Sequence, residues 1–320
     1  MPSSRLSLRC STVADYIVHK SVELTALSKK LQADIENHTY LLSPKYDGCH
    51  AVFLFDNGAF VGARSRTNEV VASMDHIAVE LLTLYPFLQN GKHAVMGEAW
   101  ISGVGFSEIS GTFRRQSPQP QLCFVPFDTT WWRYDTCEDG RPVLGQCPDE
   151  LTGSSLDLRT YDERLGALHR KCADSASGVL QLGTTTLEQG DAIMVTAGWL
   201  ARAYKERGGY DGCVLARADG LYHVGAGKGG EFIKIKPLIS HTCVCLDVEH
   251  AKGGKTGKNT GALVVQFNGR EQRVSTGLTQ AEVDNLDQFT GKQIEVEAMG
   301  LTVNGLLREP RFKGIRTDVL

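Results

Sequence analysis

A lysine followed by Asp-Gly is the feature of this chain with the clearest chemical use. Lys45 stands in the run Lys45-Tyr46-Asp47-Gly48-Cys49-His50, between two apolar segments that we expect to be strands. A partly buried ammonium with cations nearby gives up its proton more easily, and the free amine is a nucleophile. An isolated lysine of this kind is more often an edge-strand residue before a turn. The other motifs of the chain decide between these interpretations.

The composition is that of an ordinary globular protein. The 320 residues carry a formal net charge of −3, and 42% of them are hydrophobic. This charge gives no global sign of a nucleic-acid partner, although positive charge is concentrated locally. Three basic clusters stand out, at residues 202–217, 252–258 and 308–316.

Cysteine usage and hydropathy indicate an intracellular protein. The nine cysteines include no C-x-x-C pair, so we expect reduced thiols and neither a zinc site nor a disulfide framework. Cys243 and Cys245 alternate along a predicted strand and should point to one face. No apolar run approaches the roughly 20 residues that span a bilayer. Residues 1–11 do not form a signal segment, so we expect a cytoplasmic protein without a membrane partner.

Helices and short strands are predicted around Lys45. Residues 13–36 have apolar side chains near helical spacing, and residues 53–63 predict a hairpin around Asp56-Asn57-Gly58. The other predicted elements are helices over residues 74–88, 159–172 and 199–205, strands over residues 93–101, 121–127, 212–216 and 231–235, and a surface insertion over residues 129–153.

The pattern changes after Pro237, which we expect to lie in a linker. Short strands predicted at residues 242–249, 261–268, 271–275 and 293–301 are separated by Gly-rich turns, with a helix over residues 280–289. Short strands with one helix in about 80 residues favour a Greek-key barrel of the OB type. The sequence therefore predicts an α+β protein with two domains, residues 1–237 and residues 238–320.

Seven motifs follow one another in an order that resembles the covalent nucleotidyltransferases, most closely the compact ATP-dependent DNA ligases of bacteriophage type. Their motifs K-x-D-G-x-R, Ser-Arg, Gly-Glu and aromatic-Asp are matched at residues 45–50, 65–66, 97–98 and 127–128. The motifs E-G-x-x-x-K, K-x-K and R-x-P-R-F…R-x-D are matched at residues 211–216, 234–236 and 308–318. One such motif is weak evidence, but seven in order are specific. The resemblance covers the chain from about residue 40, and implies an adenylation domain of antiparallel sheets and flanking helices before the OB-fold barrel.

The resemblance implies a role for each matched residue. Lys45 attacks the α-phosphorus of ATP, giving lysyl-AMP and pyrophosphate. Glu98 accepts hydrogen bonds from the ribose hydroxyls, and Phe127 stacks on adenine. Asp211 and Glu98 bind Mg²⁺ or Mn²⁺ through hard carboxylate oxygens. The other nucleotide-binding residues implied are Ser43, His50, Arg66, Lys234, Lys236 and Arg316.

Local geometry bears on three further assignments. Lys234 and Lys236 alternate on a strand, so both ammoniums should face the α-phosphate. Arg164 is matched to a family arginine near the nick phosphate. The loop at residues 252–256 resembles a P-loop only superficially, because Glu249 stands in place of the first glycine. We expect a basic loop that contacts the phosphate backbone.

The chain departs from the family motifs at three positions. His50 replaces an arginine, so a permanent charge becomes one that titrates near neutrality. Asp211 replaces a glutamate and shortens the metal ligand by one methylene. Ala216 replaces a lysine, for which Arg217 is a candidate substitute. These departures affect contacts at the nick and the metal distance rather than the lysyl-AMP step.

The resemblance therefore implies an ATP-dependent DNA ligase that seals 5′-phosphate/3′-hydroxyl nicks in duplex DNA through lysyl-AMP and adenylated DNA. We expect ATP and Mg²⁺ (or Mn²⁺) as cofactors, nicked duplex DNA as the partner, and a monomer. An mRNA capping guanylyltransferase shares the lysine and the barrel and stays an alternative, as does a catalytically silent nucleic-acid-binding relative. The R-x-P-R-F segment favours the ligase. The intact Lys45, Glu98, Lys234 and Lys236 weigh against a silent relative.

Overall fold

A computed structural model describes residues 18–131, 134–136, 142–144, 157–169, 178–223, 225–226, 229–252, 259–302 and 304–316. The chain divides into two compact units, the first ending at Ile235 and the second beginning at Lys236. Each unit has a hydrophobic core of its own. Among the described residues, no helix is long and apolar enough to cross a membrane.

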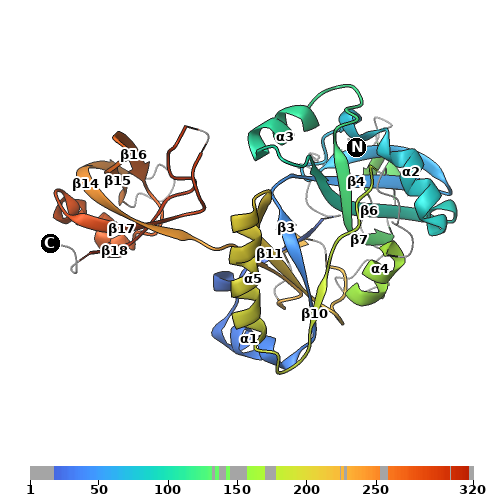
Figure 1. The fold of residues 1–320 in the computed structure, drawn as a ribbon, viewed down its shortest axis with the longest axis horizontal. Coiled ribbons are helices and arrows are strands. Elements are labelled where there is room, and N and C mark those ends of the chain that lie inside the picture. The colour runs from blue at the N-terminus through green and yellow to red at the C-terminus, as the bar shows by residue number, and fades with distance from the viewer. Residues whose placement is uncertain are drawn as a thin grey trace, which may run out of the picture. The chain divides into compact units, whose positions relative to one another are not determined.

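Two sheets form the frame of the first unit (Figure 1). The first sheet has the order β10-β3-β11-β13-β2, and the second has the order β5-β4-β6-β7. All neighbouring strands are antiparallel except β13 and β2. The first sheet comprises β10 (Thr185–Leu187), β3 (Tyr40–Tyr46), β11 (Tyr210–Arg217), β13 (Phe232–Ile235) and β2 (Val22–Glu23). The second comprises β5 (Ala59–Ser65), β4 (Cys49–Asp56), β6 (Lys92–Trp100) and β7 (Cys123–Trp131).

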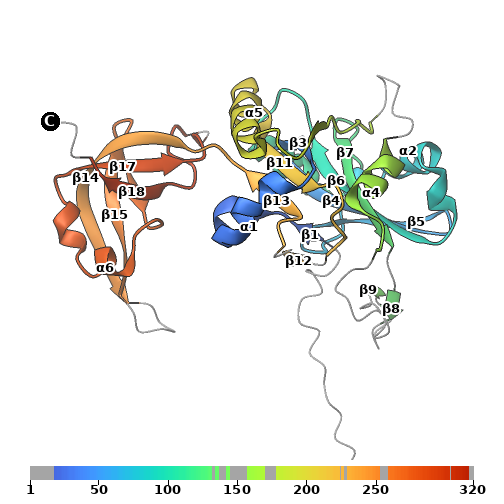
Figure 2. The same cartoon turned by 90° about the horizontal axis from the view of Figure 1, so that it is seen from below.

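Two strand pairs lie outside these sheets. β1 (His19–Lys20) pairs in parallel with β12 (Gly225–Ala226). β8 (Tyr134–Thr136) pairs antiparallel with β9 (Pro142–Leu144), within the region that the sequence predicts as an insertion. Figure 2 shows both pairs.

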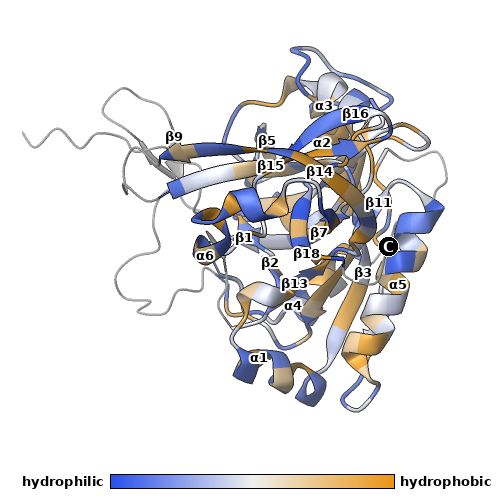
Figure 3. Ribbon diagram, turned by 90° about the vertical axis from the view of Figure 1, so that its left-hand side faces the viewer, coloured by the Kyte–Doolittle hydropathy of each residue, from blue (hydrophilic) through white to orange (hydrophobic). Residues whose placement is uncertain are grey.

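Helices cover the outer face of each sheet. α5 (Ile193–Arg207) contacts β3, β11 and β13 through an apolar stripe spaced at four residues: Ile193, Ala197 and Ala201. Its first half is hydrophobic and its last turn is hydrophilic (Figure 3), and it ends at Gly208, whose φ is 83°. The second sheet is covered by α2 (Ile77–Leu84) and α3 (Phe106–Phe113), while α4 (Tyr161–Leu168) contacts β7.

The inner faces of the two sheets share a core. Leu41 of β3 and Ala216 of β11 lie in one buried cluster with Val125 of β7. Because side chains alternate along a strand, Ser43 and Lys45 follow Leu41 onto this inner face. The residues that the sequence singles out are therefore carried by the facing sides of the two sheets.

The hairpin prediction is confirmed, whereas the first helix is wrong over most of its described length. β4 and β5 pair around Asn57 (φ 48°) and Gly58 (φ 79°), as a type I′ turn requires. Between residues 18 and 36, the only α-helix is α1 (Lys29–Asp34), preceded by β1, β2 and the 3₁₀ turn η2 (Leu24–Ala26). Leu27 and Ile35 pack into the core beneath α5. The apolar spacing arose from these core contacts rather than from a continuous helix.

The second unit is a five-stranded barrel in the order β16-β15-β14-β17-β18. Its strands are β14 (Ile239–Lys252), β15 (Asn259–Phe267), β16 (Arg270–Val274), β17 (Gln293–Ala298) and β18 (Arg311–Ile315), with α6 (Gln280–Val283) and the 3₁₀ turn η6 (Leu286–Phe289) between β16 and β17. A parallel bridge from Thr276 to Arg311 joins the end of β16 to β18, and the Phe312 N–H donates to the Thr276 carbonyl at 2.8 Å. This closure gives the OB topology. Cys243 and Cys245 both point into its core, as predicted.

Candidate active site

Lys45 lies near the end of β3, opposite an irregularity in β11. The register pairs Tyr46 with Tyr210 and Lys45 with Gly212, so Asp211 is the extra residue of a bulge. The bulge places a carboxylate oxygen of Asp211 3.6 Å from the Lys45 ammonium. The Lys45 side chain is 24% exposed and that of Asp211 only 7%. The amine is therefore open to a ligand while its carboxylate partner is held inside the sheet.

Gly48 permits a close contact between the loop after β3 and strand β6. A Cβ atom at this position would overlap the carbonyl oxygen of Ala99 and lie 2.9 Å from Cγ of Glu98. The Gly48 N–H donates a hydrogen bond to the Glu98 carboxylate. The glycine of the lysine motif thus sets how closely Lys45 and Glu98 approach one another.

Glu98 and His50 face each other across β6 and β4, and Arg66 follows directly after β5. Burial raises the pKa of Glu98 to about 7, although the nearby charges of Lys45 and Arg66 lower it. Burial, followed by the charge of Arg66, lowers the pKa of His50 to about 3. The expectation that His50 titrates near neutrality is therefore wrong, because this imidazole stays neutral at physiological pH.

Phe127 sits at a bulge in β7 and is partly exposed. Its ring centroid is 5.6 Å from that of His50, and its carbonyl accepts a 3.0 Å hydrogen bond from the Tyr161 hydroxyl. Gly97 allows β7 this close approach, since a Cβ there would lie 2.5 Å from a ring carbon of Phe124. Phe127 is thus anchored at its backbone while part of its ring stays available for stacking.

Ser43, Val214 and Lys234 form one row across the first sheet, from β3 through β11 to β13. Cross-strand partners point to the same face, so Lys234 shares the inner face with Lys45. The Lys234 ammonium is 3.9 Å from a carboxylate oxygen of Glu23 on β2. The inner face therefore carries two ammonium groups.

Lys236 and Arg316 belong to the second unit. β13 ends at Ile235, so the prediction that Lys234 and Lys236 alternate on one strand is wrong. The Lys236 ammonium lies 4.0 Å from the sulfur of Met299, and the Arg316 guanidinium donates to the Thr242 hydroxyl at 3.2 Å. Their contacts with a nucleotide stay predictions.

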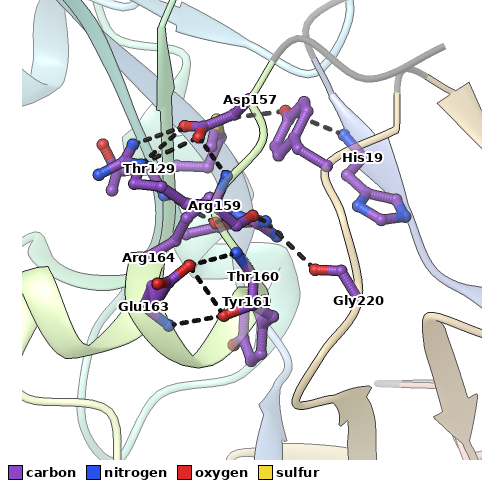
Figure 4. A network of polar contacts seen from close by, with 12 residues as sticks. His19, Thr129, Asp157, Arg159, Thr160, Tyr161, Glu163, Arg164 and Gly220 are labelled. Atoms are coloured by element: carbon purple, nitrogen blue, oxygen red, sulfur yellow. Dashed lines mark hydrogen bonds and ion pairs between the residues drawn. The ribbon is translucent and has the colours of Figure 1, made fainter. Parts of the chain in front are cut away.

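Arg164 is fully buried, so the expectation that it lies near a nick phosphate is wrong (Figure 4). Its Nε donates to one oxygen of Asp128 at 2.7 Å and a terminal nitrogen donates to the other at 3.3 Å. The second terminal nitrogen donates to the carbonyls of Arg159 and Gly220. Arg164 ties α4 to β7 and to the segment after β11.

Arg217 does not replace the lysine expected at position 216. Ala216 is buried on the inner face of the first sheet, and its neighbour on the strand points the opposite way. The guanidinium of Arg217 pairs with the carboxylate of Asp219 at 2.8 Å. The loop at residues 253–258 and Asp318 of the last motif lie outside the described residues.

A cluster of aromatic side chains that is not evident from the sequence lies beside the lysine motif. Tyr46 contacts Trp100 and Tyr210 with ring centroids 5.3 Å and 5.0 Å apart, and Tyr204 of α5 contacts Tyr210 at 5.7 Å. Burial, and then the neighbouring Tyr210, raises the pKa of Tyr46 to about 12. Only the sheet register, which brings β3 beside β11, could have placed these separated residues together.

Asp211 and Glu98 fit a divalent cation that arrives with its nucleotide. Among the described residues, no group of three or more His, Cys, Asp and Glu could hold a metal ion. Mg²⁺ needs only one or two protein carboxylates when phosphates and water complete its coordination. Asp211 and Glu98 are therefore carboxylate donors of the kind that could hold Mg²⁺ together with phosphate and water ligands.

Comparisons with known proteins agree with this architecture. Residues 253–316 match the family model of the DNA ligase OB-like domain. A solved structure named Pmar-Lig_PreS3 is similar with a TM-score of 0.68 at 17% identity, over 91% of this chain and 66% of that one. The fold is that of the DNA ligases. A Lig E DNA ligase, described as binding DNA with a minimal scaffold, is similar with a TM-score of 0.62 at 19% identity, over 93% of this chain and all of that one. A search of the curated proteins found no match.

The fold of each unit agrees with the sequence prediction. The two antiparallel sheets form the first unit and the OB-type barrel forms the second, in the α+β architecture that the sequence predicts. The chain spans about two thirds of the length of Pmar-Lig_PreS3.

Proposed function

We propose that this protein is an ATP-dependent DNA ligase that seals nicks between a 5′-phosphate and a 3′-hydroxyl in duplex DNA. The observation that supports it best is the placement of Lys45, 3.6 Å from Asp211, with Lys234 on the same sheet face. Glu98 of the second sheet lies beside the lysine motif, because its carboxylate accepts a hydrogen bond from the Gly48 N–H. A partly exposed amine among cations and carboxylates suits attack on a metal-bound phosphate.

In the first step the neutral amine of Lys45 attacks the α-phosphorus of ATP. A nitrogen–phosphorus bond forms, the nitrogen gives up a proton to solvent, the bond to the bridging oxygen breaks, and pyrophosphate leaves with the electron pair. Asp211, as the nearest carboxylate, holds the amine in line before attack. Lys234 neutralises charge that develops on the phosphate oxygens.

The next two steps use the same pocket. A 5′-phosphate oxygen at the nick attacks the phosphorus of lysyl-AMP. The nitrogen–phosphorus bond breaks, the lysine nitrogen takes up a proton from solvent, and adenylated DNA is left. The 3′-hydroxyl then attacks the 5′-phosphorus, loses its proton, and releases AMP. Mg²⁺ or Mn²⁺ at Asp211 and Glu98 would neutralise phosphate charge when bound. Phe127 would stack on adenine, and Ser43, His50 and Arg66 would line the nucleotide site.

The test is incubation with ATP labelled at the α-phosphate and with Mg²⁺, followed by denaturation. Label that stays on the denatured protein, and moves to a nicked duplex on chase, supports the ligase. Label taken from GTP and moved to a 5′-diphosphate RNA end would instead identify a capping guanylyltransferase. Absence of label from both nucleotides, with DNA binding intact, would identify a silent relative and overturn the proposal.

A further inference from the structure

Glu23 is a carboxylate on the edge strand of the first sheet that the proposed chemistry does not use. Strand β2 pairs in parallel with β13, and the register places Glu23 directly opposite Lys234. A carboxylate oxygen of Glu23 lies 3.9 Å from the Lys234 ammonium. The side chains of Lys234 and Glu23 are 26% and 37% exposed, so a ligand that binds to this face can reach both charges.

The packing of the neighbouring residues directs Glu23 to the inner face. Apolar residues on both sides of Glu23 and of Lys234 pack into the core beneath α5: Val22, Leu24, Ile233 and Ile235. Because successive side chains of a strand point to opposite faces, the two charged residues face away from this core. Glu23 also occupies the N-cap position of η2, but its side chain makes no cap hydrogen bond. The fold therefore directs this carboxylate to Lys234 and not to the turn.

The carboxylate of Glu23 and a substrate phosphate would compete for the same ammonium. A separation of 3.9 Å is longer than a hydrogen bond, so the contact is between charges and does not fix the direction of the ammonium. A phosphate that approaches Lys234 also approaches Glu23, and like charges repel. Asp211 differs, because as a candidate metal ligand it can bind the cation that accompanies the phosphates. Strand β13 separates Glu23 from the strand of Asp211.

We propose that Glu23 is a positioning residue that holds the Lys234 ammonium on the inner face and competes with the substrate phosphate for it. This inference rests on the proposed ligase function. Glu23 keeps the affinity for ATP below the highest value that the cations of this face allow. It also gives Lys234 a partner again when pyrophosphate leaves. Because the carboxylate weakens the binding of ATP and of its transition state alike, it changes the ATP concentration needed for self-adenylation and not the maximal rate.

The first test is calorimetric titration with α,β-methylene-ATP, whose adenylyl group cannot be transferred, and with adenosine, which has no phosphate. Glu23→Gln should bind the analogue about fivefold more tightly, or by about 1 kcal/mol, and adenosine with unchanged affinity. In self-adenylation with labelled ATP, the half-saturating ATP concentration should fall by the same factor while the maximal rate stays the same. Glu23→Asp keeps the charge and should remain close to the wild type.

Two further variants test whether Glu23 acts through Lys234. In a Lys234→Met background, Glu23→Gln should no longer tighten binding of the analogue, because the ammonium for which the two groups compete is gone. The matched control is Asp56, which lies 3.4 Å from the Lys92 ammonium at the hairpin end of the second sheet and has a similar exposure of 32%. Asp56→Asn should leave the affinities for the analogue and for adenosine unchanged.

Three results would overturn the inference. The first is equal or weaker binding of the analogue by Glu23→Gln. The second is an equal gain for the analogue and adenosine, which would mean a general structural effect. The third is a gain of the same size in the Lys234→Met background, which would mean that Glu23 acts without Lys234. Failure of the ligase proposal is separate, because it shows as absence of Lys45 labelling in a protein that still binds the analogue.

Discussion

At the scale of single residues, Lys45 carries the proposed chemistry. Its ion pair with Asp211 allows the role of its charge to be tested separately from its role as a nucleophile. Lys45→Arg keeps a cation opposite Asp211, but a guanidinium stays protonated and cannot attack. We expect no acid-stable label from α-labelled ATP with Lys45→Arg or Lys45→Ala. Circular dichroism of Lys45→Arg should match that of the wild type. Persistent labelling of either variant would identify another nucleophile.

Glu98 should make nucleotide binding depend on pH. Its pKa is raised from 4.5 to about 7, so it ionises across the neutral range. The ionised carboxylate is the better acceptor for hydroxyl donors, so the affinity for ATP should rise between about pH 6 and pH 8. Glu98→Gln should remove this part of the pH dependence in calorimetric titrations. Identical pH profiles for the two proteins would contradict the assignment.

The contribution of Glu98 to folding stability should fall as pH rises, whereas the affinity for ATP should rise. Because the folded state binds the Glu98 proton more tightly than the unfolded state, the stability that this group contributes is present at low pH and is lost as pH rises from 4.5 through 7. The difference in the free energy of unfolding between Glu98→Gln and the wild type should therefore shift in favour of Glu98→Gln from pH 4.5 to about pH 7. It should be constant at higher pH. Urea titrations at about pH 5 and pH 8 measure the difference.

At the scale of elements, the ion pair between Arg164 and Asp128 connects α4 to β7. Arg164→Ala should destabilise the first unit by about 3–5 kcal/mol, because Asp128 would be left buried and uncompensated. Combining Arg164→Met with Asp128→Leu should restore much of this loss. Urea unfolding measures both effects. If Arg164→Ala had normal stability but bound nicked DNA more weakly, we would instead conclude that Arg164 contacts DNA.

At this scale, elements with local sequence signals could be predicted, whereas contacts that depend on strand register could not. The hairpin at Asn57-Gly58 and the barrel strands could be predicted from local turn residues and from the alternation of apolar and polar side chains. The buried role of Arg164 could not be foreseen, because its partner is 36 residues away and only the fold brings them together. The bulge at Asp211 is likewise visible only in the pairing of β3 with β11. Residue types at the site were predictable, but their burial was not.

At the scale of the whole molecule, the second unit should fold independently. Its core is formed by residues of its own strands and of the turn η6, and the bridge from Thr276 to Arg311 closes its sheet. Residues 236–320 expressed alone should therefore unfold cooperatively in urea. A fragment ending at residue 309 lacks β18 and should not, because Phe312 would be missing from the core. Cooperative unfolding of the shorter fragment would contradict this view of the closure.

At the scale of the whole protein, nick binding and self-adenylation should differ in their dependence on salt concentration. The net charge is only −3, so DNA binding must depend on local clusters of Lys and Arg that release counterions from phosphates. Nick binding should weaken with a slope of about −0.9 in log–log form for each phosphate contacted. Self-adenylation should respond far less. Equal salt slopes for the two activities would count against an electrostatic DNA interface.

The close contact at Gly48 has an evolutionary consequence. Any side chain there would collide with the carbonyl oxygen of Ala99 and push the lysine loop away from Glu98. A single codon change at this position could thus silence the proposed chemistry and leave the core of the second unit untouched. Gly48, like Lys45, is therefore a position at which one substitution would separate the proposed enzyme from a non-catalytic relative.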